Sequence, residues 1–571
     1  MSSWKLAAAF ALVGLRAVGA QNCTFDSITP SRDLVWCSCE GHFFCAKLDV
    51  SYLSHGIPPL ITNSISQVPL DYQNPSLGRA SVPLIKIAAT AGSPDGPYRG
   101  AILINPGGPG ASGVELARNN GTTVQVAAGS NFDIIGFDPR GVGLSEPRPN
   151  CSAGIPKHQS GALSGRDAPR VVDAYYQQFI DFGKELGKKC QAQTGADTEA
   201  GPHMTTAVTA RDMLSIVEAF SASPDGNRTV LDSSKLNYYG VSYGTMLGQT
   251  FASMFPGRVG HVAIDGVVDP ANYQANFTSG SIYHLDGVLG AFFVYCHAAG
   301  PDVCSFYSGN TPKDIFSRWN ASFVQLDPQR AEAKGWANAT DIGLALVTLK
   351  VSILSAVVQP LAEFRRISDV FVALEKAISS SAIAAWTEQT NAIYGDPNVG
   401  GYVNPEQTLG VLCSDQSNVW YGKSLEDIQP LLDGLKDNSI VGEVWSRAML
   451  GCLEWPIRSN DVFRGPYGGN TSYPMLFVSN TFDPTTPIEN AILNAPKYVN
   501  ARRVTIDGMG HTTTATNNRC GFGAIRSYFQ DTMCGKEHYC PLELGPFNVQ
   551  LNGTIQENLE TAGLSNLRSL Y

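Results

Sequence analysis

Short apolar runs alternate with amphipathic segments along the first half of the chain. The apolar runs predict strands, and residues 206–220 carry an apolar stripe at helical spacing. The expected strands are residues 81–88, 101–104, 132–137, 236–239 and 259–268. Strands that alternate with helices in this way are typical of a mainly parallel sheet with helices on both faces. The pattern therefore predicts an α/β fold.

The pattern becomes mainly helical between residues 270 and 473. Strand signals return only at residues 474–478 and 503–506. The helices expected in the block are residues 312–326, 341–358, 370–386 and 425–435. We therefore expect a core in two parts, residues 21–269 and 474–571, with a helical cap at residues 270–473 inserted before the last strands. The second part of the core ends in a Cys-rich tail.

The first twenty residues have the layout of a secretory signal peptide. Lys5 precedes an apolar run at residues 6–15, and residues 18–20 offer a cleavage site. About ten apolar residues are too few to span roughly 30 Å of hydrocarbon. The later apolar segment 342–358 is interrupted by polar residues such as Lys350, which favours a packed helix. We therefore expect a secreted protein without stable membrane insertion.

Nine Asn-x-Ser/Thr sequons agree with export, because this pattern is the acceptor for N-glycosylation in secreted proteins. The predicted glycosylation sites are Asn22, Asn120, Asn150, Asn227, Asn276, Asn320, Asn338, Asn470 and Asn552.

The thirteen cysteines point to disulfides rather than to a metal site. The cluster at residues 37–45 lacks the CxxC or paired-His spacing of a zinc site, so no metal is expected. The odd count leaves at least one thiol unpaired. The predicted local pairs are Cys296–Cys304, Cys413–Cys452 and Cys151–Cys190.

Composition narrows the function classes. The 571 residues are 43% hydrophobic and only 16% charged, against about 25% in typical soluble chains, so the chain can bury a large core. Lys and Arg number 40 against 50 Asp and Glu, a net charge of −10, with no long run of either sign. A nucleic-acid binder needs a basic face, so nucleic acid is not an expected partner.

The clearest chemical signal is Gly-Val-Ser-Tyr-Gly at residues 240–244, between an expected strand and an expected helix at 246–255. A sharp strand-to-helix turn exposes such a serine and requires glycine two positions before and after it, because side chains there would collide with neighbouring backbone. The helix N-terminus also favours the negative charge that forms on attack. Ser242 is therefore the predicted nucleophile.

A serine hydroxyl needs a base, and in this arrangement the order along the chain is serine, acid, histidine. Among nine histidines, His511 follows the expected strand 503–506 through a Gly-containing loop, where a catalytic histidine belongs. Asp483 follows the strand that begins at residue 474 and is the preferred acid. Asp269, after an earlier strand, is its rival.

Backbone donors must stabilise the oxyanion that forms on attack. One is expected from the N–H of Tyr243, which follows the nucleophile, and the other from Gly107 and Gly108 in the loop at 105–110. That loop lacks the Lys-Ser/Thr ending of phosphate-binding loops, and its prolines remove donors.

These residues also carry a family resemblance. The motifs are residues 105–110, 137–145, 239–245 and 510–511, together with 68–72, 413–415 and 452–456. They resemble the α/β-hydrolases of the prolyl/tripeptidyl-aminopeptidase family, in the secreted branch with a tripeptidyl-aminopeptidase-like C-terminal region. The resemblance runs from about residue 45 to residue 540. It implies the α/β-hydrolase fold, with Ser242 as nucleophile, His511 as base, Asp483 as acid, and Gly108 and Tyr243 at the oxyanion hole.

One position departs from the family. Its members commonly have Gly-His-Gly at the base, whereas Thr512 follows His511 here, which leaves the substrate open between peptides and esters. Aminopeptidases of the family hold the free amine of the substrate with acidic cap residues. Asp415 and Glu454 match these by motif position, and ordinary salt bridges within the cap are the alternative role for both.

The leading hypothesis is a secreted serine hydrolase without a cofactor, most simply an exopeptidase that releases short N-terminal peptides or amino acids through an acyl-enzyme. The alternative is a carboxylesterase or a lactone or amide hydrolase that acts on small metabolites. A third hypothesis is an inactive binding module on the same fold, which the complete set of triad residues disfavours.

Overall fold

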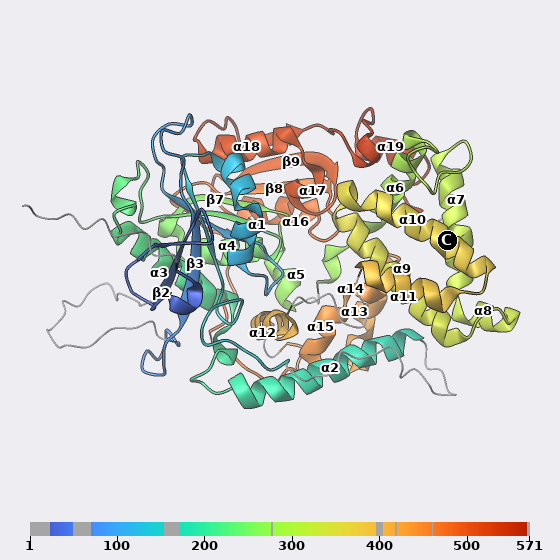
Figure 1. The fold of residues 1–571 in the computed structure, drawn as a ribbon, viewed down its shortest axis with the longest axis horizontal. Helices are drawn as coiled ribbons and strands as arrows, with labels where there is room; N and C mark the ends of the chain where they lie inside the picture. Colours follow the sequence, from blue (N-terminus) through green and yellow to red (C-terminus); the bar gives the residue numbers. More distant parts are fainter. Residues whose placement is uncertain are drawn as a thin grey trace, which may run out of the picture.

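The computed structural model describes residues 23–49, 70–152, 171–275, 278–394, 404–416, 419–459 and 461–567. Ten strands form one sheet in the order β1-β2-β3-β5-β4-β6-β7-β8-β9-β10 (Figure 1). The neighbouring pairs β1–β2, β2–β3 and β3–β5 are antiparallel. All the other neighbouring pairs in this order, from β5–β4 to β9–β10, are parallel. The strands are β1 Cys37–Cys39, β2 Phe43–Asp49, β3 Ser81–Ile87, β4 Ala101–Asn105, β5 Asp133–Phe137, β6 Leu236–Val241, β7 Val259–Asp265, β8 Leu476–Phe482, β9 Arg502–Met509 and β10 Glu537–Cys540. The sheet is therefore mainly parallel, as predicted.

Side chains alternate between the two faces of each strand, which builds a separate core on each face. In β4, Ile102 and Ile104 join the core under α1 and α18, whereas Leu103 joins the core under α3 and α4. Because both faces are covered, the central strands are apolar on both sides. These helices are α1 Gly113–Ala128, α3 Thr206–Ala222, α4 Tyr243–Met254 and α18 Arg519–Phe529, and the shorter α16 Ile488–Asn494 and α17 Thr512–Thr516 follow β8 and β9.

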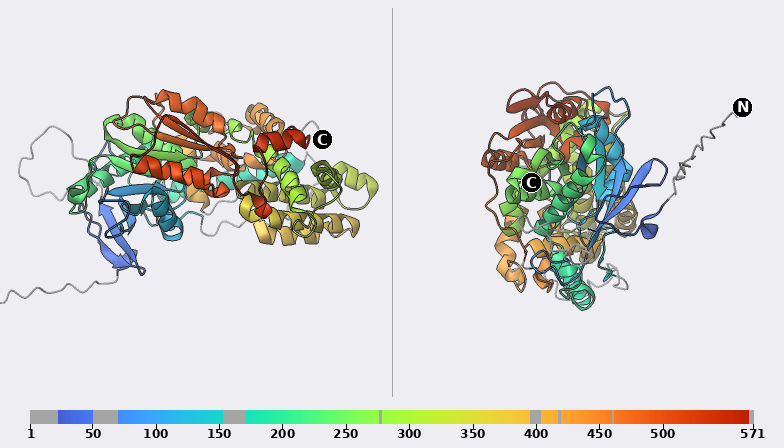
Figure 2. Two further views of the ribbon diagram at one scale, coloured as in Figure 1. Left: turned by 90° about the horizontal axis from the view of Figure 1, so that it is seen from above. Right: turned by 90° about the vertical axis from the view of Figure 1, so that its left-hand side faces the viewer.

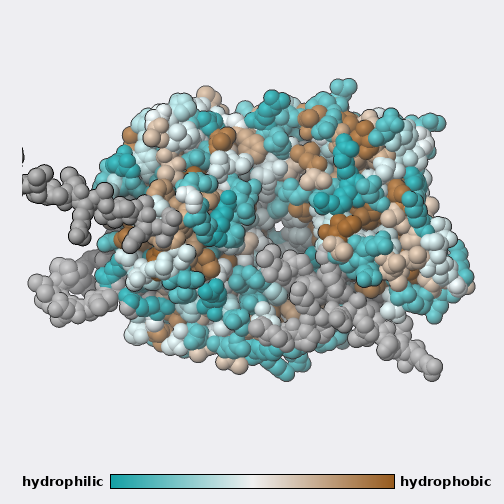
Figure 3. Space-filling model, in the orientation of Figure 1, coloured by the Kyte–Doolittle hydropathy of each residue, from teal (hydrophilic) through white to brown (hydrophobic). Residues whose placement is uncertain are grey.

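A helical half lies beside the sheet and contains its own buried apolar cluster (Figures 1 and 2). Its helices between β7 and β8 are α5 Pro270–Ala275, α6 Leu285–Ala299, α7 Pro312–Phe323, α8 Pro328–Lys334, α9 Ala339–Val358, α10 Pro360–Ser379, α11 Ile383–Tyr394, α12 Pro405–Asp415, α13 Leu425–Asn438, α14 Gly442–Trp445 and α15 Arg447–Leu450. Side chains of α2, Val171–Thr194, and α19, Ile555–Thr561, join the same cluster. The helical core therefore also draws on elements outside residues 270–473. The face seen in Figure 3 is hollowed between the two halves.

The helix α9 is packed inside this half. Among the helices that the structure describes, it is the one long and apolar enough to cross a membrane, and 72% of its most apolar window is buried within the protein. Lys350 on its buried side forms an ion pair with Glu443 at 2.7 Å. The helix therefore packs as the polar interruptions at residues 348–352 predicted.

The single helix predicted at residues 370–386 is wrong. Residues 360–394 form two helices, α10 and α11, because Ser381 between them has a φ of +56°, which a right-handed helix does not allow. The strands near the end of the chain are longer than predicted. β8 runs to Phe482 and β9 to Met509, so Asp483 follows its strand directly and most of the loop expected before His511 is strand.

The three predicted disulfides, Cys296–Cys304, Cys413–Cys452 and Cys151–Cys190, are confirmed. Further disulfides join Cys23 to Cys37, Cys39 to Cys45 and Cys520 to Cys540, and Cys534 is an exposed free thiol. His538 lies near Cys520 and Cys540, whose sulfurs are already bonded to each other. The predicted signal peptide lies outside the described residues.

Candidate active site

Ser242 lies in a sharp turn between β6 and α4. Its φ of +57° and ψ of −126° fall in a region that non-glycine residues seldom adopt, and its N–H donates to the Asp265 carbonyl at 3.0 Å. A Cβ on Gly240 would lie 2.4 Å from the Tyr238 ring, and a Cβ on Gly244 would lie 2.8 Å from the Asn105 carbonyl oxygen. The two glycines are therefore required by the close packing of this turn, as the sequence pattern predicted.

His511 follows β9 and contacts Asp483, which follows the neighbouring strand β8. The Nδ1 atom of His511 lies 3.0 Å from each carboxylate oxygen of Asp483. Val358, the last residue of the cap helix α9, accepts the backbone N–H of His511 at 2.9 Å. The sheet and the cap therefore both fix the position of the imidazole, and Nδ1 is occupied while Nε2 remains for a second partner.

Asp483 is fully buried and is surrounded by donors. Its carboxylate accepts the backbone N–H groups of Thr485, Thr486 and Thr512 at 2.9–3.1 Å. Burial alone would raise the pKa of Asp483, but the charge of His511 and these hydrogen bonds outweigh it and hold the pKa below its usual value. Asp483 is therefore ionised at neutral pH.

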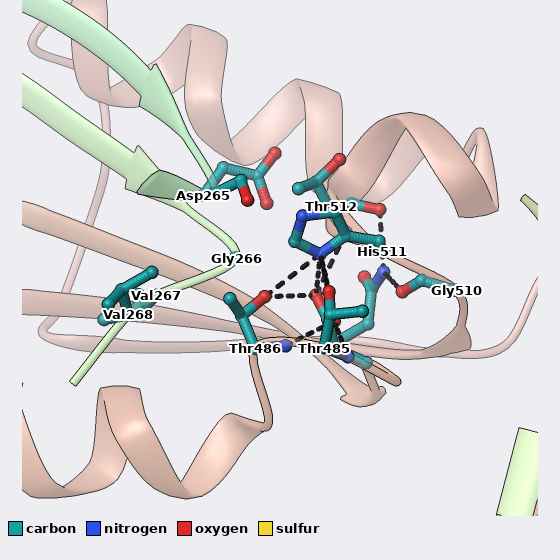
Figure 4. Close-up of polar contacts among 12 residues, drawn as sticks. Asp265, Gly266, Val267, Val268, Thr485, Thr486, Gly510, His511 and Thr512 are labelled. Carbon is teal, nitrogen blue, oxygen red and sulfur yellow. Dashed lines mark hydrogen bonds and ion pairs between the residues drawn. The ribbon is translucent and has the colours of Figure 1, made fainter. Parts of the chain in front are cut away.

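The His511 ring lies between the two threonines and Asp265. Figure 4 shows Thr485 and Thr486 on one side of the ring and Asp265 on the other. Burial lowers the pKa of His511, but the charges of Asp483 and Asp265 outweigh it and raise the pKa above its usual value. Asp265 is itself buried, which raises its pKa to about 6, and its carboxylate accepts the N–H of Thr513 at 3.1 Å. The site therefore stabilises a positive charge on the imidazole.

Asp269, the rival acid, is occupied elsewhere. Its carboxylate accepts the backbone N–H of Asn272 at 2.9 Å and the side-chain amide of Asn494 at 3.0 Å. No hydrogen bond joins it to His511 among the described residues. These contacts make Asp269 a cap for α5 and support Asp483 as the partner of the imidazole.

The loop after β4 lies against the nucleophile turn. Gly107 has a φ of +95°, and a Cβ there would lie 2.8 Å from the Ser242 Cβ and 2.9 Å from the Tyr243 nitrogen. Only a glycine allows this close approach of the loop to the turn. Gly108 follows and, with Ser242 and Tyr243, lines a common cavity. Gly108 and Tyr243, whose amides are expected to hold an oxyanion, therefore line the same cavity as the serine.

The cavity has a volume of about 510 Å³ and lies between the sheet and the cap. Ser242 and His511 both line it, together with the threonines Thr485 and Thr486. The cap contributes mostly apolar side chains, among them Leu354, Val358, Leu412, Val444, Trp445 and Met449. Concave, largely apolar sites with a few convergent polar groups are typical of small-molecule and peptide binding.

The two acidic residues expected to bind an amine are not among the described residues that line this cavity. Asp415 is buried behind Tyr273, whose hydroxyl donates to it at 3.0 Å, and it also accepts the backbone N–H of Thr206 at 2.8 Å. Burial raises its pKa to about 6. Glu454 lies on the 3-10 helix Gly451–Glu454. Asp415 is therefore one side chain away from the cavity, and Glu454 is not in its wall.

Sequence reasoning missed the residues that hold this site in place. Asn480 donates to the carbonyls of Gly510 and Thr512, at 2.8 and 2.7 Å, and so fixes the backbone on both sides of His511. Thr512 has a φ of +67°, which accounts for the glycine that the family commonly has at this position. The Asp-Pro-Thr-Thr run at residues 483–486 was the available signal for the turn that holds Asp483, because aspartate often accepts hydrogen bonds from backbone N–H groups two or three residues further along the chain.

Six of the predicted glycosylation sites are exposed: Asn120, Asn150, Asn227, Asn338, Asn470 and Asn552. Asn320 is half-buried, and Asn22 and Asn276 lie outside the described residues.

Comparisons with known proteins agree with this architecture. The family model of the alpha/beta hydrolase fold matches residues 100–279, and that of TAP-like protein matches residues 438–540. Three similar proteins are each 26% identical to this chain: serine protease Hip1 of Mycobacterium tuberculosis (strain H37Rv), tripeptidyl aminopeptidase of Streptomyces lividans and carboxylesterase B of M. tuberculosis (strain CDC 1551). The alignments cover 79%, 83% and 81% of this chain and 82%, 82% and 83% of those proteins. The chain therefore has the α/β-hydrolase fold, and its residues 438–540 are similar to TAP-like protein.

Proposed function

We propose that this protein is a secreted serine hydrolase in which Ser242, His511 and Asp483 act as a catalytic triad on peptides, releasing short N-terminal pieces. The observation that carries the proposal is the contact of His511 with the buried Asp483, because His511 lines the same cavity as the strained Ser242 turn. The names of the similar proteins, a serine protease and a tripeptidyl aminopeptidase, favour a peptide substrate.

The geometry suggests how each group acts. Ser242 attacks the scissile carbonyl while Nε2 of His511 takes its proton, and Asp483 stabilises the imidazolium through Nδ1. The amides of Gly108 and Tyr243 donate to the oxyanion, each worth about 3–4 kcal/mol. His511 then returns the proton to the leaving amine, and water hydrolyses the acyl-enzyme by the same steps.

A fluorophosphonate probe tests the nucleophile. We expect the probe to label Ser242 and expect Ser242→Ala and His511→Ala to lose labelling and turnover together, because the triad acts as one unit. Ser281, which lines the same cavity, provides the matched control, and Ser281→Ala should still be labelled. Labelling at another residue, or unchanged turnover of Ser242→Ala, would contradict the assignment. A folded protein that is not labelled would point instead to an inactive binding module.

The carboxylesterase is the second candidate, because the described lining of the cavity contains no carboxylate for a free amine and one similar protein is a carboxylesterase. Matched peptide anilides with a free and an acetylated N-terminus distinguish the two. An aminopeptidase should prefer the free amine by about 30-fold or more in kcat/KM. Asp415→Asn should remove this preference if Asp415 reaches the amine, and Glu454→Gln tests the other candidate in the same way. Equal values for the two peptides on the wild type would favour the esterase.

Secretion and glycosylation can be tested on the expressed full chain. We expect the protein in the medium, beginning near Gln21, and a fall in mass on treatment with a glycosidase that removes N-linked glycans. The six exposed sequons support this expectation. Retention inside the cell in an unmodified form would contradict it.

A further inference from the structure

Arg447 introduces a positive charge into the wall of the cavity that holds Ser242. It is the first residue of α15, in the cap, and it lines the cavity together with the apolar side chains Val444, Trp445 and Met449. Among the described lining residues none is Asp or Glu, and His511 is the other side chain that can carry a positive charge. The described part of the cavity therefore has an excess of positive charge.

The guanidinium of Arg447 is incompletely paired. Its Nη1 atom is buried and has no hydrogen-bond partner, and no described carboxylate lies within ion-pair distance of the side chain. The nearest carboxylate along the chain on the adjoining helix, Glu443, instead binds Lys350 at 2.7 Å. The fully buried Arg140, in contrast, is paired with Asp212 at 2.7 Å.

A buried N–H of a charged group without a partner in the protein is costly, so an acceptor that binds in the cavity would be stabilised by pairing with it. The guanidinium presents its donors in a planar fork that matches a carboxylate, and the surrounding apolar wall strengthens such a pair. We infer that Arg447 binds a carboxylate of the substrate, so that the enzyme prefers substrates with a negative charge close to the scissile bond. This inference rests on the proposed role of Ser242, because it places the bound carboxylate in the cavity where the acyl transfer occurs.

A peptide can offer this carboxylate in two ways. One is the side chain of Asp or Glu near the scissile bond, and the other is the free C-terminus of a short peptide. Both sources would present a carboxylate to Arg447. Amidation of the side chain removes the carboxylate in the first case, and amidation of the C-terminus removes it in the second.

The test compares kcat/KM for matched peptides that differ by one amide. In one series Glu is replaced by its neutral isostere Gln at each of the three residues before the scissile bond and the first residue after it. In the other, a short peptide with a free C-terminus is compared with its C-terminal amide. We expect one of these pairs to show a preference of about 10- to 100-fold for the acid on the wild-type enzyme, the range for a hydrogen bond to a charged group.

The variant Arg447→Gln should bring this ratio close to one, and Arg447→Lys, which keeps the charge without the fork, should retain part of it. Arg519→Gln is the matched control, because Arg519 is 95% exposed and outside the cavity, and it should leave the ratio unchanged. The labelling of Ser242 by the fluorophosphonate probe separates the two proposals. Normal labelling with no acid preference in any wild-type pair, or with a preference that Arg447→Gln retains, would overturn the role of Arg447. Loss of labelling in the wild type would overturn the proposed function itself.

Discussion

Asp483→Asn is expected to lower kcat by about 10⁴-fold while the chain remains folded. Nδ1 of His511 lies 3.0 Å from both carboxylate oxygens, so the new amide group faces Nδ1 in either orientation. An amide N–H donates to Nδ1 and leaves the proton on Nε2, which then cannot act as the base. The expected loss corresponds to about 5 kcal/mol in the activation barrier, since each tenfold change in rate equals about 1.4 kcal/mol.

The effect on stability is smaller. If the new NH2 takes the place of the oxygen near Thr512, only the backbone N–H of Thr512 loses its acceptor. In the other orientation, the backbone N–H groups of both Thr485 and Thr486 lose their acceptor. The first orientation is therefore preferred, and one unpaired buried N–H costs about 1–3 kcal/mol of the free energy of unfolding.

The assay measures kcat with a peptide anilide or an ester at saturating concentration and urea unfolding on the same samples. Asp269→Asn is the matched control. It should change kcat by only a few-fold, because no hydrogen bond joins Asp269 to His511 among the described residues, and it should leave α5 capped, since Asn and Asp are comparable N-cap residues. A larger loss of kcat in Asp269→Asn than in Asp483→Asn would refute this reasoning and would move the acid to the earlier strand.

Three further changes test the geometry around the site. Gly107→Ala should lower both activity and Tm, because its Cβ would lie 2.6 Å from the Val241 carbonyl oxygen, whereas Gly257→Ala, with no atom within 4 Å, should change neither by much. Asp265→Asn should shift the acidic limb of the pH dependence of kcat/KM to lower pH. The charge of Asp265 raises the pKa of His511, so its removal lets the base lose its proton at lower pH, and an unchanged limb would refute the coupling. Gly434→Ala in α13 should raise the free energy of unfolding by about 0.5–1 kcal/mol in urea titrations, since the new methyl group meets no neighbour.

The sequence by itself determined the elements whose signal is local. The apolar run at residues 101–104 predicts β4 because both faces of a parallel strand are buried, and the glycines at 240 and 244 predict the turn that exposes Ser242 because only glycine fits there. The three disulfide pairs predicted from the sequence are also present.

The tertiary structure decided what depends on contacts between distant residues. Periodicity gives the direction of a side chain but not its partner, so the sequence preferred Asp483 to Asp269 without showing that Asp483 contacts His511 and that Asp269 contacts Asn272. The same limit hid Asn480, which fixes the backbone around His511 across 30 residues of sequence, and Asp415, which matches an amine-binding motif but is buried behind Tyr273. It also hid Arg447, because whether a charge is paired depends on which side chains the fold brings near it, and that is set by the packing of the cap on the sheet.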